Sequence, residues 1–147
     1  MADYDLNVIA DALASRFQGL NTYTFDGQQQ VVTATSEAAG VANVPAIVIE
    51  LDDITWDITM ARGADSFVFL AYLLVSSADS PNGQKLVRQL LSTGGLAGKV
   101  KDALENDQTL GGQVSYAIAT GTRTIGNINY AGADYLGATI EIQVVAQ

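Results

Sequence analysis

The sequence has 147 residues, 48% of them hydrophobic, and contains neither cysteine nor histidine. This length suits a single domain over residues 1–147, while the missing residue types exclude disulfides, thiolate chemistry, histidine-based acid–base catalysis and ordinary zinc sites. The formal net charge of −9 disfavours a nucleic-acid-binding domain, because acidic side chains repel phosphate.

The first expected element is an amphipathic helix over residues 5–18. Its apolar residues recur at helical spacing and comprise Leu6, Ile9, Ala10, Leu13 and Phe17. Next, Asp26-Gly27 separates two β-prone runs, which predicts a β-hairpin. The small, weakly polar residues that follow lead us to expect a long flexible loop at about 26–44. This loop could become ordered on contact with a partner, or it could be a surface loop without a function.

The middle of the chain is expected to form strands. One strand covers residues 46–51, Asp52-Asp53 interrupts it, and a second strand begins at Ile54. The segment 66–77 is apolar on both faces. That pattern is typical of a strand buried on both sides, or of one whose second face is covered by another subunit.

Two helices and further strands complete the chain. Ser80-Pro81 and Gly94-Gly95 are start and stop signals for one helix, and a short helix containing Val100 and Leu104 follows. Strands are expected over 114–119 and 127–130, separated by a turn-rich piece, and over the last residues of the chain. This order predicts an α+β fold, a largely antiparallel sheet with one N-terminal and two central helices packed on one face.

The paired glycines Gly111-Gly112 allow two interpretations. A phosphate-binding loop requires glycines after a strand and before a helix, so that the helix N-terminus faces the phosphate. Here the expected order is helix, glycines, strand, and no Gly-Lys-Ser/Thr motif follows. We therefore interpret the glycines as a turn that uses positive φ angles.

The best carboxylate cluster consists of Asp52, Asp53 and Asp57. Neighbouring residues of a regular strand point to opposite faces, so only Asp53 and Asp57 could share a site. An acidic turn between strands is the simpler interpretation, with a weak calcium site or a glycosidase pair as alternatives. Trp56 and the tyrosines are interpreted as core residues. We expect no enzymatic activity, no cofactor and no resident metal.

Charge is distributed unevenly along the chain. Residues 1–80 hold two basic and eleven acidic side chains, whereas residues 81–123 hold five basic and three acidic ones. This asymmetry suits head-to-tail contacts between copies, although solvated helix faces produce the same pattern. The start MADYDLN is acidic where a signal peptide is basic, and the longest apolar run, 67–75, is too short to span a bilayer. We expect a chain made in the cytoplasm, without a membrane partner.

Four stretches of the sequence resemble the tail terminator proteins of long-tailed, non-contractile (siphovirus-type) bacteriophages, most closely those from phages of actinobacteria. They are DLNVIADALASRF, MARGADSFVFLAYLLVSSAD, QTLGGQVSYAIATG and YAGADYLGATIEIQVVA. The most telling pieces are Arg62-Gly63 with Asp65, Leu110-Gly111-Gly112 and Tyr135-Leu136-Gly137.

The resemblance implies a virion protein whose six-fold ring caps the tail tube at its head-proximal end and stops polymerisation. The implied partners are further copies of the chain, the tail tube protein, and a head–tail connector or stopper protein. Genomic DNA would pass through the lumen without specific binding. Tail tube subunits and head–tail connector proteins share a similar fold and are the nearest alternatives.

Two sets of residues are candidates for this role. A lumen that passes DNA should repel phosphate, and the candidate lining consists of Asp52, Asp53 and Asp57. One face of the 66–75 strand could contact a neighbouring subunit, and the candidate contacts are Phe67, Phe69, Tyr72 and Leu74. Two other classes remain open, a carboxylate-based hydrolase and a binding module that uses the edge of the 66–75 strand.

Overall fold

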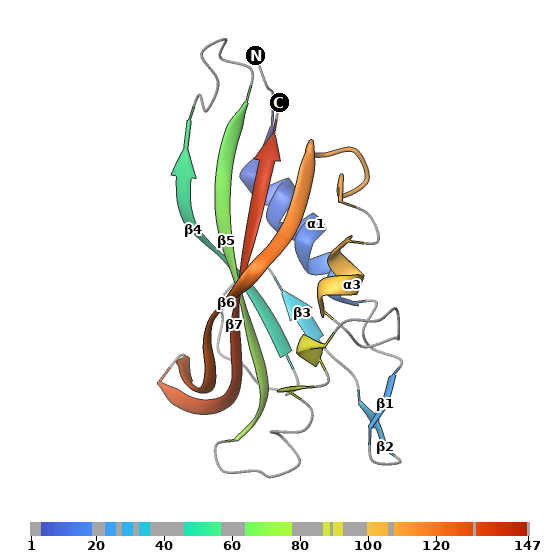
Figure 1. The fold of residues 1–147 in the computed structure, drawn as a ribbon, viewed down its shortest axis with the longest axis vertical. Helices are drawn as coiled ribbons and strands as arrows, with labels where there is room; N and C mark the ends of the chain where they lie inside the picture. Colours follow the sequence, from blue (N-terminus) through green and yellow to red (C-terminus); the bar gives the residue numbers. More distant parts are fainter. Residues whose placement is uncertain are drawn as a thin grey trace.

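The computed structural model describes residues 4–18, 23–25, 28–30, 33–35, 46–56, 64–77, 87–88, 90–92, 100–105, 108–130 and 132–146. Over these residues the chain combines a five-stranded sheet with a few helices, which confirms the predicted α+β class (Figure 1). The elements are α1 (Leu6–Gln18), β1 (Tyr23–Phe25), β2 (Gln28–Gln30), β3 (Thr33–Thr35), β4 (Ala46–Thr55), β5 (Asp65–Ser77), α3 (Val100–Glu105), β6 (Tyr116–Tyr130) and β7 (Ala133–Ala146).

The five strands of the main sheet lie in the order β3-β4-β5-β7-β6. All neighbouring pairs are antiparallel except β3 and β4, which are parallel. Strand β5 lies between β4 and β7, so both of its edges are occupied along most of its length. The alternative of a binding module that uses the edge of residues 66–75 therefore lacks a free edge in this structure.

The segment before β4 contains more strand than the sequence analysis predicted. The pairing of Phe25 with Gln28 confirms the hairpin, whose turn residues lie outside the described part of the chain. Strands β2 and β3 lie within the predicted loop 26–44, so the prediction of one long loop is wrong for these residues. Threonine, which forms two of the three residues of β3, favours strands, and β3 gains a partner in β4. The remainder of the predicted loop lies outside the described residues.

Two expected interruptions of the sheet are β-bulges within continuous strands. Strand β4 runs through Asp52-Asp53, with Asp52 as an extra residue between the paired Leu51 and Asp53. Strand β6 continues through the predicted turn-rich piece, with extra residues at Thr120 and Arg123. A bulge absorbs one residue and bends the strand without ending the hydrogen-bonded ladder, which is why both predicted breaks are wrong.

Helix α1 forms as its sequence pattern predicts. Asp5 precedes the helix, and its Oδ1 accepts a hydrogen bond of 2.8 Å from the backbone N–H of Asn7, which satisfies a donor of the first turn. The predicted stripe faces inward, since Ile9, Leu13 and Phe17 are fully buried. Burying one such side chain stabilises the fold by roughly 1.5–3 kcal/mol.

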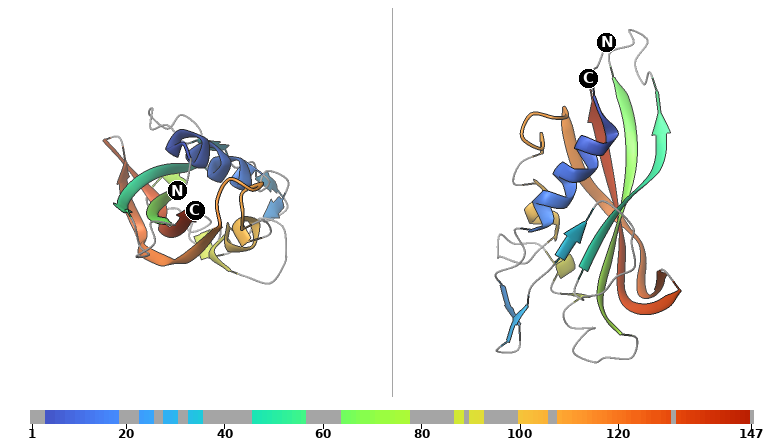
Figure 2. Two further views of the ribbon diagram at one scale, coloured as in Figure 1. Left: turned by 90° about the horizontal axis from the view of Figure 1, so that it is seen from above. Right: turned by 180° about the vertical axis from the view of Figure 1, so that it is seen from behind.

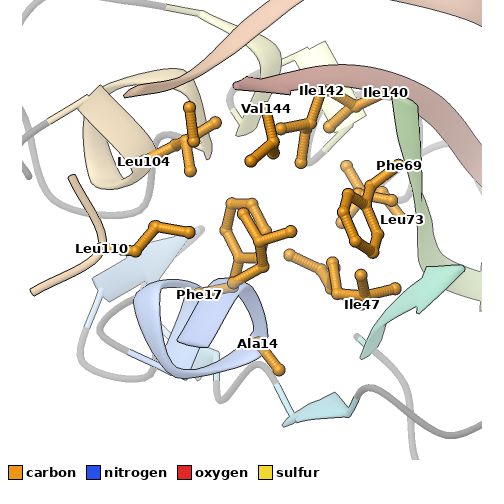
Figure 3. Close-up of a cluster of buried hydrophobic side chains, with 14 of the residues drawn as sticks. Ala14, Phe17, Ile47, Phe69, Leu73, Leu104, Leu110, Ile140, Ile142 and Val144 are labelled. Atoms are coloured by element: carbon orange, nitrogen blue, oxygen red, sulfur yellow. The ribbon is translucent and has the colours of Figure 1, made fainter. Parts of the chain in front are cut away.

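The main core lies between α1, α3 and one face of the sheet (Figure 3). Phe17 of α1 points into the middle of this cluster, with Leu104 of α3, Phe69 of β5 and Ile142 of β7 around it. Arg16 also links the helices, because its Nη2 donates a 3.3 Å hydrogen bond to the carbonyl of Ala103 near the end of α3. Residues of both helices thus belong to the same buried cluster as Phe69 of β5.

A second, smaller cluster lies on the opposite face of the sheet. It joins Val48 of β4 and Leu74 of β5 to Ile128 and Tyr130 near the end of β6. In a flat sheet β4 and β6 would be separated by three strand spacings, about 14 Å. The β6–β7 hairpin therefore curls over this face, as Figures 1 and 2 show. The chain itself thus covers part of the second apolar face of β5.

The stretch around Gly111-Gly112 is a turn between α3 and β6. Leu110, Gly111 and Gly112 have φ angles of 52°, 72° and 90°, so the predicted use of positive φ is confirmed. A left-handed conformation costs a non-glycine residue about 1–3 kcal/mol. Leu110 is only 4% exposed, and burial of its side chain in the main core offsets that cost.

Candidate functional site

The most highly organised polar group of the described chain is an ion-pair triad on the face opposite α1. It comprises Asp52 of β4, Arg123 of β6 and Glu141 of β7. Nη2 of Arg123 lies 2.9 Å from Oδ2 of Asp52, and its Nε donates a 2.8 Å hydrogen bond to Oε2 of Glu141. These hydrogen bonds raise the pKa of the Arg123 guanidinium. One cation thus joins β4 to β6 and β7, although β5 separates β4 from β7 in the sheet.

Two of the three residues of this triad are the extra residues of β-bulges. Asp52 and Arg123 lie at the irregular positions of β4 and β6, where the side chain leaves the regular alternation. The bulge also changes the expected geometry of the carboxylates. Asp53 pairs with Val68, on the same side of β5 as Tyr72, so Asp52 and Asp53 both lie on the face opposite α1. The expectation that they occupy opposite faces is wrong.

Two tyrosines lie next to the acidic side chains. The rings of Tyr72 and Tyr130 are 5.5 Å apart. Burial raises the pKa of Tyr72, as do the negative charges of Glu50 and Asp52, while Arg123 lowers it. Burial also raises the pKa of Tyr130, with smaller contributions from Glu50 and Tyr72. Both phenols therefore stay neutral at physiological pH, and the hydroxyl of Tyr130 is buried without a hydrogen-bond partner.

The candidate lumen residues have different environments. Asp52 is neutralised by Arg123, whereas Asp53 is exposed and its Oδ1 accepts a 2.9 Å hydrogen bond from the backbone N–H of Ile54. Asp57 lies outside the described residues. Glu50, which the sequence analysis did not single out, is exposed on the same strand. The acidic surface is therefore centred on Glu50 and Asp53.

The candidate interface residues of β5 are divided between the two faces of the sheet. Phe67 and Phe69 are 0% and 1% exposed and belong to the core beneath α1. Leu74 is also fully buried, in the cluster on the opposite face. Only Tyr72 of the four retains exposed surface. A contact between subunits remains a prediction, and in this conformation Tyr72 is the member of the set that could take part.

Exposed apolar side chains provide a signal that the sequence analysis missed. Trp56, interpreted as a core residue, is 66% exposed directly after β4, and Leu51 of β4 is 38% exposed. On β6, Ile125 is 61% exposed and Tyr116 is 37% exposed. The alternating pattern does not show that β6 is an outer strand, or that β3 pairs with β4 only from Ala46 to Val48.

Two shallow grooves accompany these edges. One, of about 230 Å³, lies between α1 and β4 and is lined mainly by apolar residues, including Leu6, Ala10, Leu51 and Phe69. The other, of about 350 Å³, lies beside β6, with Leu91, Ala119, Ile125 and Lys101 in its lining. Neither lining contains a pair of carboxylates. Both grooves therefore suit apolar contacts better than acid–base chemistry.

Two further searches of the described residues gave no candidate site. No group of three Asp or Glu side chains there is close enough to hold a metal ion. None of the described helices has the length and apolar character needed to cross a bilayer. No protein-family model matches this sequence, and no match among curated proteins was found.

Proposed function

We propose that this chain is a structural subunit of a phage tail, and that copies of it form a ring that caps the tail tube. The ring ends tube polymerisation and provides the surface to which the head joins. The proposed partners are the tail tube protein and a head–tail connector or stopper protein, and DNA passes through the lumen unbound. In this proposal the chain is not an enzyme, and the helices α1 and α3 remain on one face of the subunit.

The observation that carries this proposal is the uneven charge along the sequence. The acidic residues 1–80 contribute β3 and β4, at one side of the sheet, with Glu50 and Asp53 exposed on β4. Residues 81–123, in which basic residues outnumber acidic ones, contribute the first half of β6, the strand at the opposite edge. An object with complementary opposite sides suits the head-to-tail contacts from which rings are built.

The resemblance to tail terminator proteins supports the same role. The four stretches that carry it correspond largely to α1, β5, the turn that leads into β6, and β7. These elements supply most of the main core. The six-fold symmetry and the position at the head-proximal end of the tail come from this resemblance alone, as does assembly in the host cytoplasm.

Electron microscopy of negatively stained protein, alone and mixed with tail tubes, tests the proposal. Single rings, or caps found only at tube ends, would support a terminator. Long tubes formed by this protein alone would instead identify a tail tube subunit, because a tube subunit stacks through two complementary faces. Rings that bind the head side but not tubes would favour a connector. Monomers that do not bind tail tubes would overturn the proposal.

We do not propose the carboxylate-based hydrolase. Asp52, the middle of the acidic stretch, is held by Arg123 in an ion pair, and neither groove is lined by two carboxylates that could act as a pair. Loss of a hydrolytic activity in Asp53→Asn would be the result that reopens this alternative.

A further inference from the structure

Two tyrosines and a glutamate lie together on the face of the sheet opposite α1. Val48 of β4 pairs with Tyr72 of β5, and Glu50 lies two residues further along β4, on the same face. Glu50 and Tyr72 are therefore diagonal neighbours, close enough for their side chains to meet. The ring centroid of Tyr130 lies 5.5 Å from that of Tyr72, and the two rings are inclined by 43°. We call Glu50, Tyr72 and Tyr130 the tyrosine–carboxylate site.

Polar groups of this site have no partner in the described part of the chain. Tyr130 is only 9% exposed, and its hydroxyl makes no hydrogen bond. Glu50 is exposed and takes part in none of the ion pairs of the described residues. Burial and, after it, the charge of Glu50 raise the pKa of both tyrosines, so the carboxylate lies near both phenols. Buried polar groups in native proteins are almost always hydrogen-bonded, and the Tyr130 hydroxyl therefore indicates a bound partner.

The surroundings of this site carry more negative than positive charge. Arg123 is shared by two carboxylates, those of Asp52 and Glu141, and Glu50 adds a third. The other basic residues of the described chain belong to helical segments whose apolar side chains pack on the opposite face of the sheet, and they comprise Arg16, Arg88 and Lys101. A partner of this face should therefore bring its own positive charge.

A carboxylate beside two tyrosine rings suits a guanidinium better than an ammonium. The guanidinium group is planar, so it can stack on an aromatic ring while its N–H groups donate to oxygen atoms at its rim. It is also more weakly hydrated than an ammonium, and so loses less on leaving water. Tyr72 keeps exposed surface and offers its ring, Glu50 offers its carboxylate, and Tyr130 offers a phenol oxygen.

We propose that the tyrosine–carboxylate site binds an arginine side chain of a partner protein. The guanidinium lies over the ring of Tyr72, pairs with Glu50 and donates an N–H to the hydroxyl of Tyr130. Access to this buried hydroxyl requires a side-chain shift, and the exposed Glu50 is free to turn together with the guanidinium. The inference goes beyond the proposed function, because this contact does not depend on a ring.

An NMR titration of the full chain with N-acetyl-arginine amide tests the site. The ring signals of Tyr72 and Tyr130 are assigned by their absence in Tyr72→Phe and Tyr130→Phe. N-acetyl-citrulline amide is the matched neutral probe, with nearly the same shape and no charge, and N-acetyl-lysine amide supplies an ammonium instead. The arginine probe should shift both ring signals saturably, the lysine probe should bind more weakly, and the citrulline probe should shift neither signal.

Variants of the chain locate the binding. Glu50→Gln should weaken binding of the arginine probe about fivefold, as expected for an exposed ion pair, and Tyr130→Phe should weaken it by a smaller factor. Asp11→Asn is the matched control, because Asp11 is exposed on α1 and its substitution removes the same charge on the other side of the sheet. This control should bind like the wild type. Circular dichroism checks that each variant is folded.

Other outcomes would overturn the inference in distinguishable ways. Absence of a saturable shift with the arginine probe, or an equal shift with the citrulline probe, would exclude a cation site. Equal weakening by Glu50→Gln and Asp11→Asn would reveal a general effect of net charge, and unchanged binding in Tyr130→Phe would exclude the contact with its hydroxyl. Equal affinity for the lysine probe would overturn the choice of arginine.

The titration and the electron microscopy fail independently. Rings or caps on tail tubes together with a failed titration would overturn the arginine site and leave the proposed function standing. Monomers that bind the arginine probe but do not bind tail tubes would overturn the proposed function and support the site.

Discussion

The backbone carbonyl oxygen of Leu73 lies only 1.7 Å from the position that a β-carbon on Gly137 would occupy. The carbonyl carbon of Leu73 and the Cα of Leu74 are also close, at 2.8 and 3.3 Å. Gly137 pairs with Leu74 next to the β-bulge in β5, where the two backbones approach each other. No side chain can rotate away to make room, so β5 and β7 fit together only if residue 137 is glycine.

Gly137→Ala should therefore destabilise the protein severely, by about 3 kcal/mol or more. Gly121→Ala is the matched control, because a β-carbon at Gly121 meets nothing within 4 Å. Urea unfolding followed by tryptophan fluorescence or circular dichroism measures the difference. Equal stability of the two variants would contradict the close approach of β7 to β5.

Removing the hydroxyl of Tyr130 should leave the protein equally stable or make it more stable. This hydroxyl is buried without a partner, and such a group costs about 1–3 kcal/mol. Tyr4→Phe is the contrasting variant, because the Tyr4 hydroxyl donates a 2.5 Å hydrogen bond to Oδ2 of Asp65. Urea midpoints should rise or stay constant for Tyr130→Phe and fall for Tyr4→Phe. A clear loss of stability in Tyr130→Phe would show that the hydroxyl has a partner.

Tyr72 and Tyr130 should ionise later than an ordinary tyrosine during an alkaline titration. Their pKa values are raised above the usual 10.0, mainly by burial. The neutral phenols then contribute stability fully below about pH 10, and that contribution is lost as the pH rises from there toward the raised pKa values of the folded state. Tyrosinate absorbance should show a late component that the double variant Tyr72→Phe/Tyr130→Phe lacks. Loss of an early component instead would refute the assignment.

Arg123→Gln should lower the stability of the protein slightly, in a manner that depends on salt. The guanidinium contacts Asp52 and Glu141, but all three side chains are partly exposed. Exposed ion pairs contribute little and are screened by added salt. The thermal midpoint of the variant should be below that of the wild type at low ionic strength, and the gap should narrow in concentrated salt. A gap that is independent of salt would point to lost packing as the cause.

Asp53→Lys should impair DNA passage if the proposed ring is correct and β4 contributes to its lumen. Asp53 is exposed and is a better position for this substitution than Asp52, because Arg123 compensates the charge of Asp52. A new lysine would attract phosphate where the wild type repels it. Phage assembled with the variant should release DNA more slowly in an ejection assay, while Asp53→Asn should have a smaller effect. Normal release by Asp53→Lys would rule out a lumen role for this residue.

Regular periodicity in the sequence predicts the elements that have regular geometry. The spacing of Ile9, Leu13 and Phe17 predicts α1 and its buried face, and the alternation of Ile140, Ile142 and Val144 predicts the inward face of β7. The aspartate–glycine pair likewise predicts the first hairpin, because its chemistry is local. For these elements each residue's role depends on its near neighbours in sequence.

The polar site could not be predicted in the same way. A bulge shifts the phase of alternation by one residue, so Asp52 and Arg123 are at positions where the regular pattern fails. Their ion pair also requires the curl of the β6–β7 hairpin, which depends on contacts between distant segments such as Val48 and Ile128. Strand order, which makes β6 an outer strand and exposes Ile125, is likewise a property of the whole sheet.

The position of β7 between β5 and β6 has a consequence for how the chain acquires this structure. Its pairing with β6 spans a short turn, while its pairing with β5 joins residues as distant in sequence as Phe67 and Val144. Closing a hairpin takes on the order of microseconds, whereas contacts between distant segments form slowly. We therefore expect the β6–β7 hairpin to form early and its docking onto β5 to limit the rate of refolding. Gly137 lies where β7 meets β5, so its substitution should change the rate of this docking step.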